Sequence, residues 1–203
     1  MGQTVKPDRG IAVGPSADGD QSDALTDAAN AADAADAWPA RKLVVMGASA
    51  GGLDALCRVF DHAPSQSGAA FVVIQHLSPE HPTLMDTLLA RHTQMPVRLV
   101  TTETPLAPDT VYLIPPGKHL GLEGHQLTLT PKPAQGIGLP IDDFLAVAAE
   151  HWGERVLAII LSGTGGDGSR GIVRVSDAGG HVLAQSMGSS AFDGMPRLSL
   201  IHI

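Results

Sequence analysis

The chain of 203 residues is 43% hydrophobic, which is enough to bury a sizeable core in one domain and excludes disorder throughout. Its formal net charge is −8, of which residues 1–40 supply −5 through seven Asp against two Lys and Arg. The remainder is nearly balanced and lacks the clustered positive charge that a nucleic-acid-binding face requires.

Residues 1–40 are rich in Asp, Ala, Gly, Ser and Gln and hold little that could be buried, so we expect a disordered leader. Cys57 is the single cysteine, which excludes an internal disulfide and fits a reducing compartment. No apolar run approaches the ~18 to 20 residues of a membrane span, and no secretory signal is recognisable. We therefore expect a cytoplasmic protein that does not insert into membranes.

After this leader, short apolar runs alternate with segments of helical periodicity. KLVVM (42–46) predicts a buried strand, and Leu53, Leu56, Cys57 and Phe60 then recur at the spacing of one helix face. Cys57 therefore belongs to the apolar stripe of that helix and is expected in the core.

The same alternation continues along the chain. The predicted elements are the strand AFVVIQ (70–75), the helix HPTLMDTLLARHT (81–93), the strands VRLVT (97–101) and TVYLIP (110–115), the hairpin HLGLEGHQLTLT (119–130), the helix PIDDFLAVAAEHW (140–152), the strand RVLAIILSG (155–163), the helix GSRGIVRVSDAGG (168–180) and the strand HVLAQ (181–185). The region of Met187, Met195 and Pro196 is predicted to be an ordinary loop. Buried strands that alternate with helices predict an α/β fold with a doubly wound, mainly parallel sheet, helices on both faces and a small hairpin.

Polar stretches follow three of the predicted strands: GASAGG after Met46, QHLSPEH after Ile74 and SGTGGDG after Leu161. The carboxyl ends of parallel strands are where catalytic groups gather, so we expect these stretches to lie together. The first fits G-x-S-x-G, a nucleophile elbow in which tiny neighbours permit a cramped backbone and Ser49 Oγ stands clear beside N–H groups at the helix start.

A serine hydroxyl needs an imidazole to take its proton and a carboxylate to orient that imidazole. His76 directly follows a buried strand, and Asp167 lies in a glycine-rich loop that can approach another loop closely. Ser49, His76 and Asp167 are therefore the candidate catalytic residues. Their order along the chain differs from the Ser, Asp, His order of α/β-hydrolases.

Two other interpretations use the same residues. A phosphate-binding loop is disfavoured because Ser49 replaces the middle glycine of the dinucleotide fingerprint, and the lysine of a P-loop is missing. In GTGGDG, Asp167 would repel an anion. A metal site at His76, His81 and His92 is disfavoured because their spacing matches no zinc signature. The sequence predicts neither a metal nor another cofactor.

Several segments together resemble the catalytic domain of the chemotaxis protein-glutamate methylesterase family, CheB. These segments are GASAGGLDAL, FVVIQHLSPEHPTLMDTLLARHT, VYLIPPGKHL, LPIDDFL, AIILSGTGGDGSRGI and AFDGMPR. The resemblance covers residues 41–197 in unbroken order and implies the Rossmann-type three-layer fold of that domain. It implies a catalytic triad on Ser49, His76 and Asp167.

The resemblance also implies the substrate, namely methyl esters of glutamate side chains on the cytoplasmic helices of chemoreceptors. Cleavage would give glutamate and methanol, with glutamine deamidation as a side activity. Elbow logic makes the backbone N–H of Ala50 a candidate oxyanion donor, and the resemblance adds the glycine loop near Thr164. Many relatives have methionine at the latter position; if only the main chain donates, threonine suffices.

Two features depart from the family. Regulated members carry a receiver domain before the esterase, which residues 1–40 cannot form. The sequence of these segments is most similar to the N-terminal esterase of proteins that fuse CheB to a CheR-type methyltransferase and histidine kinase modules. Such methyltransferase and kinase modules are therefore expected partners, together with the receptor helices. The alternative function is a non-catalytic module that binds receptor helices within such a fusion.

The second departure is the C-terminus. The family continues beyond GMPR with a further helix-forming segment, whereas this chain ends in LSLIHI, which a common sequencing-library adapter would encode in one reading frame. We therefore expect a C-terminally truncated domain over 41–197 and a non-native tail over 198–203. Leu200 and Ile201 would then be exposed.

Overall fold

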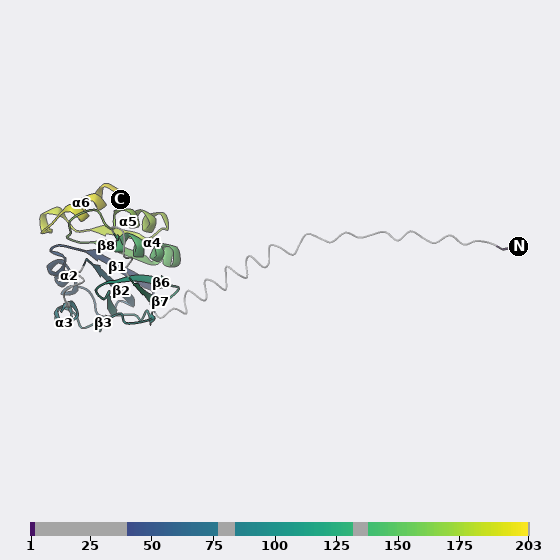
Figure 1. Cartoon of the computed structure of the whole chain (residues 1–203), viewed down its shortest axis with the longest axis horizontal. Helices are drawn as coiled ribbons and strands as arrows, with labels where there is room; N and C mark the ends of the chain where they lie inside the picture. The colour runs from purple at the N-terminus through teal and green to yellow at the C-terminus, as the bar shows by residue number, and fades with distance from the viewer. Residues whose placement is uncertain (3–39, 77–83, 132–137, 203) are drawn as a thin grey trace. The chain divides into compact units, whose positions relative to one another are not determined.

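The computed structural model describes residues 1–2, 40–76, 84–131 and 138–202. Within these ranges, six parallel strands form a sheet in the order β3-β5-β2-β1-β8-β9 (Figure 1). The strands of this sheet are β1 (Lys42–Ala48), β2 (Ala69–Gln75), β3 (Val97–Leu99), β5 (Thr110–Leu113), β8 (Val156–Ile160) and β9 (His181–Ala184). All of them lie in 38–203, the second of the two units into which the chain divides.

Helices cover both faces of the sheet. One face packs against α2 (Gly52–Phe60) and α3 (Met85–Leu89), and the other against α4 (Pro140–Trp152) and α5 (Ser169–Asp177). The predicted α/β fold with a parallel sheet between two helical layers is therefore confirmed.

The alternation of side chains along β1 explains why its sequence is apolar throughout. Leu43 and Val45 belong to the hydrophobic cluster beneath α4 and α5, whereas Val44 and Met46 belong to the cluster beneath α2 and α3. Successive strand residues point to opposite faces, and here both faces are covered. The central strand is thus fixed from both sides and holds its carboxyl end in place.

A second, smaller sheet contains the predicted hairpin. In the described part of the chain it pairs β6 (Lys118–Glu123) with β7 (Gln126–Pro131) in antiparallel register, and β4 (Thr104–Pro105) adds to the edge of β7. Gly124 occupies the turn with a φ of 58°. The hairpin prediction is confirmed, while β4 is too short to show a sequence pattern.

The predicted loop around Met195 is wrong, because Gly194–His202 form helix α6, preceded by a 3-10 turn at Met187–Ser189. Met195 is buried, and its N–H donates to Gly163 O at 2.9 Å. Tertiary contact with the loop after β8 therefore decides this structure, which local periodicity did not indicate.

The predicted helix at 81–93 is described as the shorter α3, and residues 81–83 lie outside the described ranges. The leader at 1–40 also falls mostly outside them and stays a prediction. In α6, Leu200 and Ile201 are 48% and 66% exposed, as expected. The non-native origin of 198–203 and the truncation stay predictions.

Candidate active site

The three polar loops follow adjacent strands of the sheet. Strand β1 lies between β2 and β8 in the sheet. The chain forms β2 on one side of β1 first and adds β8 on the other side later. Ala48 is paired with Gln75, and Gly47 with Ile160, so the three strands end at the same level. The His76 N–H then donates to Ala48 O at 3.2 Å. This is the edge at which a doubly wound sheet places its ligands.

The turn that carries Ser49 is crowded at its glycines. Gly51 has a φ of 70°, in the left-handed region that favours glycine. A Cβ at Gly51 would lie 2.8 Å from the Ala191 Cβ, and one at Gly52 would lie 2.6 Å from the Ala48 Cβ. These contacts explain why tiny residues surround the serine.

His76 and Asp167, predicted to act together, are in contact. His76 Nε2 lies 2.7 Å from Asp167 Oδ2, and the two side chains are 34% and 2% exposed. The carboxylate is thus buried while the imidazole faces the solvent in part. With Nε2 donating to the carboxylate, Nδ1 is the ring nitrogen left to accept a proton.

Ser49 and His76 lie beside the same open pocket of about 570 Å³, which is also lined by Leu53 and Gln75. Among the described residues no hydrogen bond joins Ser49 Oγ to the imidazole. Catalytic hydrogen bonds often form only when substrate binds. The structure therefore brings together all three predicted residues and joins two of them directly.

Asp167 is held by the N-terminus of α4. Its Oδ2 accepts the N–H of Ile141 at 3.1 Å, and its Oδ1 accepts the N–H of Asp142 at 2.9 Å. The first N–H groups of a helix lack partners within the helix and favour negative charge. This helix start, together with the imidazole, stabilises the buried carboxylate.

Asp142 makes the reciprocal contact at the start of α5. Its Oδ1 accepts the N–H groups of Arg170 at 2.9 Å and Gly171 at 2.7 Å. Two N–H groups of α4 therefore donate to Asp167 in the loop, and two N–H groups of α5 donate to Asp142 of α4. Together the four bonds fix the loop and the start of α5 to α4. Sequence reasoning missed this role, because the partners lie 28 and 29 residues apart.

The elbow has one candidate N–H group available for an oxyanion, that of Ala50. The N–H of Ser49 donates to Ser162 O at 3.0 Å, and that of Gly52 to Ser49 O at 2.9 Å. Within the described residues, the N–H of Ala50, the predicted donor, has no acceptor. Thr164, the other candidate, is exposed in the loop after β8, and the neighbouring Gly163 is so close that a Cβ there would lie 2.9 Å from the Ser49 Cβ.

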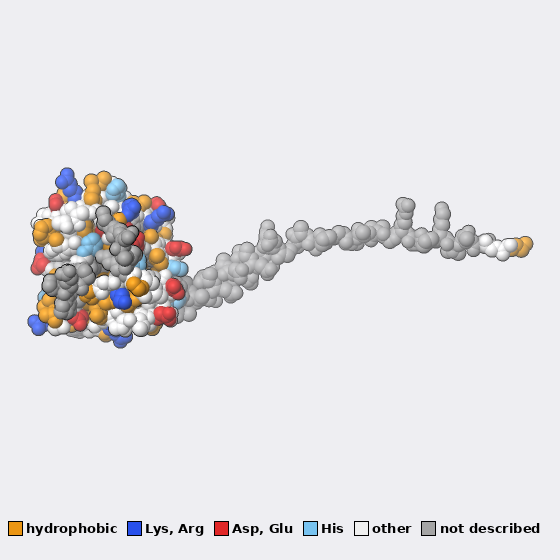
Figure 2. Space-filling view, in the orientation of Figure 1, with side chains coloured by type: hydrophobic (Ala, Val, Ile, Leu, Met, Phe, Trp, Pro, Cys, Tyr) orange, Lys and Arg blue, Asp and Glu red, His pale blue; other side chains and the backbone are white. Residues whose placement is uncertain are grey.

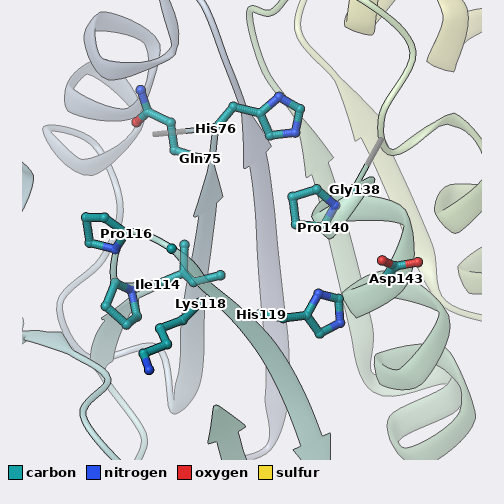
Figure 3. A pocket seen from close by; sticks show the side chains of 11 residues that line it. Gln75, His76, Ile114, Pro116, Lys118, His119, Gly138, Pro140 and Asp143 are labelled. Atoms are coloured by element: carbon teal, nitrogen blue, oxygen red, sulfur yellow. The ribbon is translucent and has the colours of Figure 1, made fainter. Parts of the chain in front are cut away.

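A second pocket of about 260 Å³ opens on the other side of His76 (Figure 3). Lys118, His119 and Asp143 contribute polar and charged groups to it. The figure shows the Gln75 side chain pointing away from the imidazole. This pocket could not be predicted from the sequence, because its walls come from β2, the segment 114–117 between β5 and β6, β6 itself and the start of α4.

Two of the three histidines proposed as an alternative metal site, His76 and His92, each contact an aspartate. His92 Nδ1 lies 2.8 Å from Asp61 Oδ1, far from the His76 contact in sequence, and His81 lies outside the described residues. The described ranges contain no group of three His, Cys, Asp or Glu side chains arranged to hold a metal.

The part of the chain that the structure describes contains no helix long and apolar enough to cross a membrane. On the face shown in Figure 2, acidic and basic side chains are interspersed.

The sequence matches the model of the CheB methylesterase family over residues 44–201. The chain belongs to this family. The structure is similar to the crystal structure of the Thermotoga maritima CheB methylesterase catalytic domain, with a TM-score of 0.72 and 28% identity over 79% of this chain and 87% of that one. The predicted family and fold are thereby confirmed.

Curated relatives include CheB-type enzymes. A protein-glutamate methylesterase/protein-glutamine glutaminase from Mesorhizobium japonicum is 36% identical over 77% of this chain, and the protein-glutamate methylesterase FrzG from Myxococcus xanthus is 34% identical over 80%. The matches cover 47% and 49% of those proteins, so the chain spans about half their length. An uncharacterized 104.1 kDa protein from Rhodobacter capsulatus is 50% identical over 57% of this chain, which is 12% of that protein.

Proposed function

We propose that this chain is a serine esterase that hydrolyses glutamate methyl esters on the cytoplasmic helices of chemoreceptors to glutamate and methanol. Glutamine deamidation is a side activity of the same site. The observation that carries the proposal is the 2.7 Å contact between His76 and the buried Asp167, beside Ser49 on its elbow. Family membership and relatives that are named protein-glutamate methylesterases support the substrate class.

In this mechanism His76 Nδ1 removes the proton of Ser49 Oγ as that oxygen attacks the ester carbonyl. The tetrahedral intermediate collapses, and methanol leaves with the proton that His76 returns. Water then attacks the acyl-enzyme while His76 takes its proton. Glutamate is released and the serine is restored.

Asp167 and the elbow support these steps. The buried carboxylate keeps the imidazole proton on Nε2, which leaves the Nδ1 lone pair free to accept the serine proton, and it stabilises the imidazolium that forms. The Ala50 N–H and the main chain near Thr164 donate to the developing oxyanion. Ala50 lies on the elbow between β1 and α2, and Asp167 is held by two N–H groups at the start of α4, so these two groups need little reorganisation during the reaction.

The test is methanol release from a methylated receptor fragment, measured for the wild-type chain and for Ser49→Ala. We expect a loss of at least ~10³-fold in the variant, because no other hydroxyl replaces the nucleophile. Ser176→Ala, an exposed serine of α5, is the matched control and should retain full activity. Equal release by Ser49→Ala and wild type would contradict the triad.

The alternative, a non-catalytic module that binds receptor helices, predicts a different pattern. Neither wild type nor Ser49→Ala would then release methanol, although both would bind the fragment. A fused or associated methyltransferase or histidine kinase stays a prediction, and the match to a small part of a 104.1 kDa protein supports a larger assembly.

A further inference from the structure

Ser162, in the loop after β8, is a buried residue that connects three segments of the chain. Its Oγ donates to Ala50 O at 2.8 Å and accepts the N–H of Phe192 at 3.0 Å. Its carbonyl oxygen accepts the N–H of Ser49 at 3.0 Å, and its own N–H donates to Gln185 Oε1 at 2.8 Å. Only 1% of Ser162 is exposed, so water cannot replace these bonds.

Two of these bonds act on the nucleophile elbow. The bond from Ser49 N fixes the peptide before Ser49, and the bond to Ala50 O fixes the peptide after Ala50. The peptide that joins Ser49 to Ala50 lies between them. Its N–H is the candidate oxyanion donor, so the bonds to Ser162 determine where that donor points and how the Ser49 side chain leaves the backbone.

The same hydroxyl also fixes the wall beside the elbow. The hydroxyl accepts the Phe192 N–H and thereby holds the segment of the neighbouring Ala191 in place. Ala191 lies so close to the elbow that a Cβ added at Gly51 would be 2.8 Å from its Cβ. Gln185 steadies this segment from the other end, because its Nε2 donates to Ser189 O at 2.9 Å. The hydroxyl therefore connects the elbow to its wall, and the Gly163 N–H, which donates to Phe192 O at 3.0 Å, holds the same wall through the main chain.

We propose that Ser162 is a positioning residue of the esterase, whose hydroxyl orients Ser49 and the Ala50 N–H for catalysis without touching the substrate. This inference rests on the proposed function. Removing the hydroxyl takes away the hydrogen-bond partner of Ala50 O and of the Phe192 N–H, and the elbow can then rotate. Displacements of about 1 Å in a catalytic group cost on the order of 100-fold in rate.

The experiment compares wild type with Ser162→Ala and Ser162→Cys in the full chain. Cysteine is close to serine in size, but its thiol is a weak donor, so it serves as the second variant if alanine prevents folding. Thr110→Val is the control, because Thr110 is also buried and its hydroxyl donates one bond, to Pro108 O at 3.1 Å. Thr110 is the first residue of β5, whereas the active site lies at the carboxyl ends of the strands. Thermal unfolding verifies that each variant is folded.

Two activities are measured. The first is kcat and KM for hydrolysis of the receptor methyl ester. The second is the rate at which a fluorophosphonate labels Ser49, in which Oγ forms the bond to phosphorus, fluoride leaves and His76 accepts the proton. The label reports the reactivity of the serine without any receptor, so it separates positioning from recognition of the substrate.

We expect Ser162→Ala to lower kcat and the labelling rate by about 10- to 100-fold with little change in KM, and Ser162→Cys to lie between it and wild type. The control should match wild type in both. A folded Ser162→Ala variant that labels and turns over within two-fold of wild type would overturn the positioning role alone. If Ser162→Ala does not fold, the same result for Ser162→Cys would overturn it. Wild-type Ser49 that is neither labelled nor active would overturn the proposed function and the positioning role with it.

Discussion

Replacing Asp142 by alanine tests the reciprocal contact between α4 and α5. The change removes the acceptor of two main-chain N–H groups, at 2.9 Å from Arg170 and 2.7 Å from Gly171. Loss of a helix-capping acceptor costs about 1–2 kcal/mol, and an unsatisfied buried N–H costs about 1–3 kcal/mol. The contact of Asp142 with the Arg170 guanidinium at 3.3 Å adds little, because that side chain is 75% exposed.

We therefore expect the free energy of unfolding to fall by about 3 kcal/mol, which corresponds to a decrease in Tm of about 6–12 °C in a domain of this size. Urea denaturation and differential scanning calorimetry measure both quantities. Asp142→Asn keeps an oxygen for the two N–H groups and should cost about 1 kcal/mol, for the lost charge alone.

Asp143→Ala is the matched control for this experiment. Asp143 is the next residue in the same helical turn, but it is exposed and no hydrogen bond of its side chain is found among the described residues. Its removal should change stability by no more than about 0.5 kcal/mol. If Asp142→Ala were no more destabilising than this control, the assignment of Asp142 as the cap of α5 would be refuted.

Two further predictions concern groups with shifted pKa values. Burial, and then the charges of Asp61 and Asp54, raise the pKa of the Cys57 thiol, so it should react with a disulfide reagent at pH 7.5 more slowly in the folded chain than in urea; equal rates would contradict this. Burial, and then the charge of Arg155, lower the pKa of His125 below 6.5. As pH falls, this histidine therefore binds a proton in the unfolded chain at a higher pH than in the folded chain. The free energy of unfolding should decrease as pH falls through 6.5. Urea titrations from pH 7.5 to 5.5 should show a smaller decrease for His125→Gln, and an unchanged decrease would show that another group is responsible.

Cys57 illustrates how far local pattern predicts burial. The helical spacing places it on the apolar stripe of α2, and it packs against the cluster beneath that helix, yet it is only partly buried. Spacing gives the direction in which a side chain points. It does not give the depth to which neighbouring elements cover it.

The sequence by itself determined the strands and helices other than β4 and α6, together with the three polar loops, because apolar periodicity and glycine reflect the local requirements of strand, helix and turn. It also identified Ser49, His76 and Asp167 as candidates, since few residue types perform nucleophilic chemistry. The positions of these residues at strand ends could be predicted from the parallel fold.

The sequence predicted that the three loops lie together, but only the tertiary structure decided their order, in which β2 and β8 lie on either side of β1 although they are far apart in the chain. The tertiary structure also decided the roles of Asp142 and Ser162. Their hydrogen bonds reach segments up to 112 residues away, and a side chain whose partner is so distant leaves no local pattern. The residue types therefore indicate the chemistry of the site, whereas the packing of the chain decides its geometry.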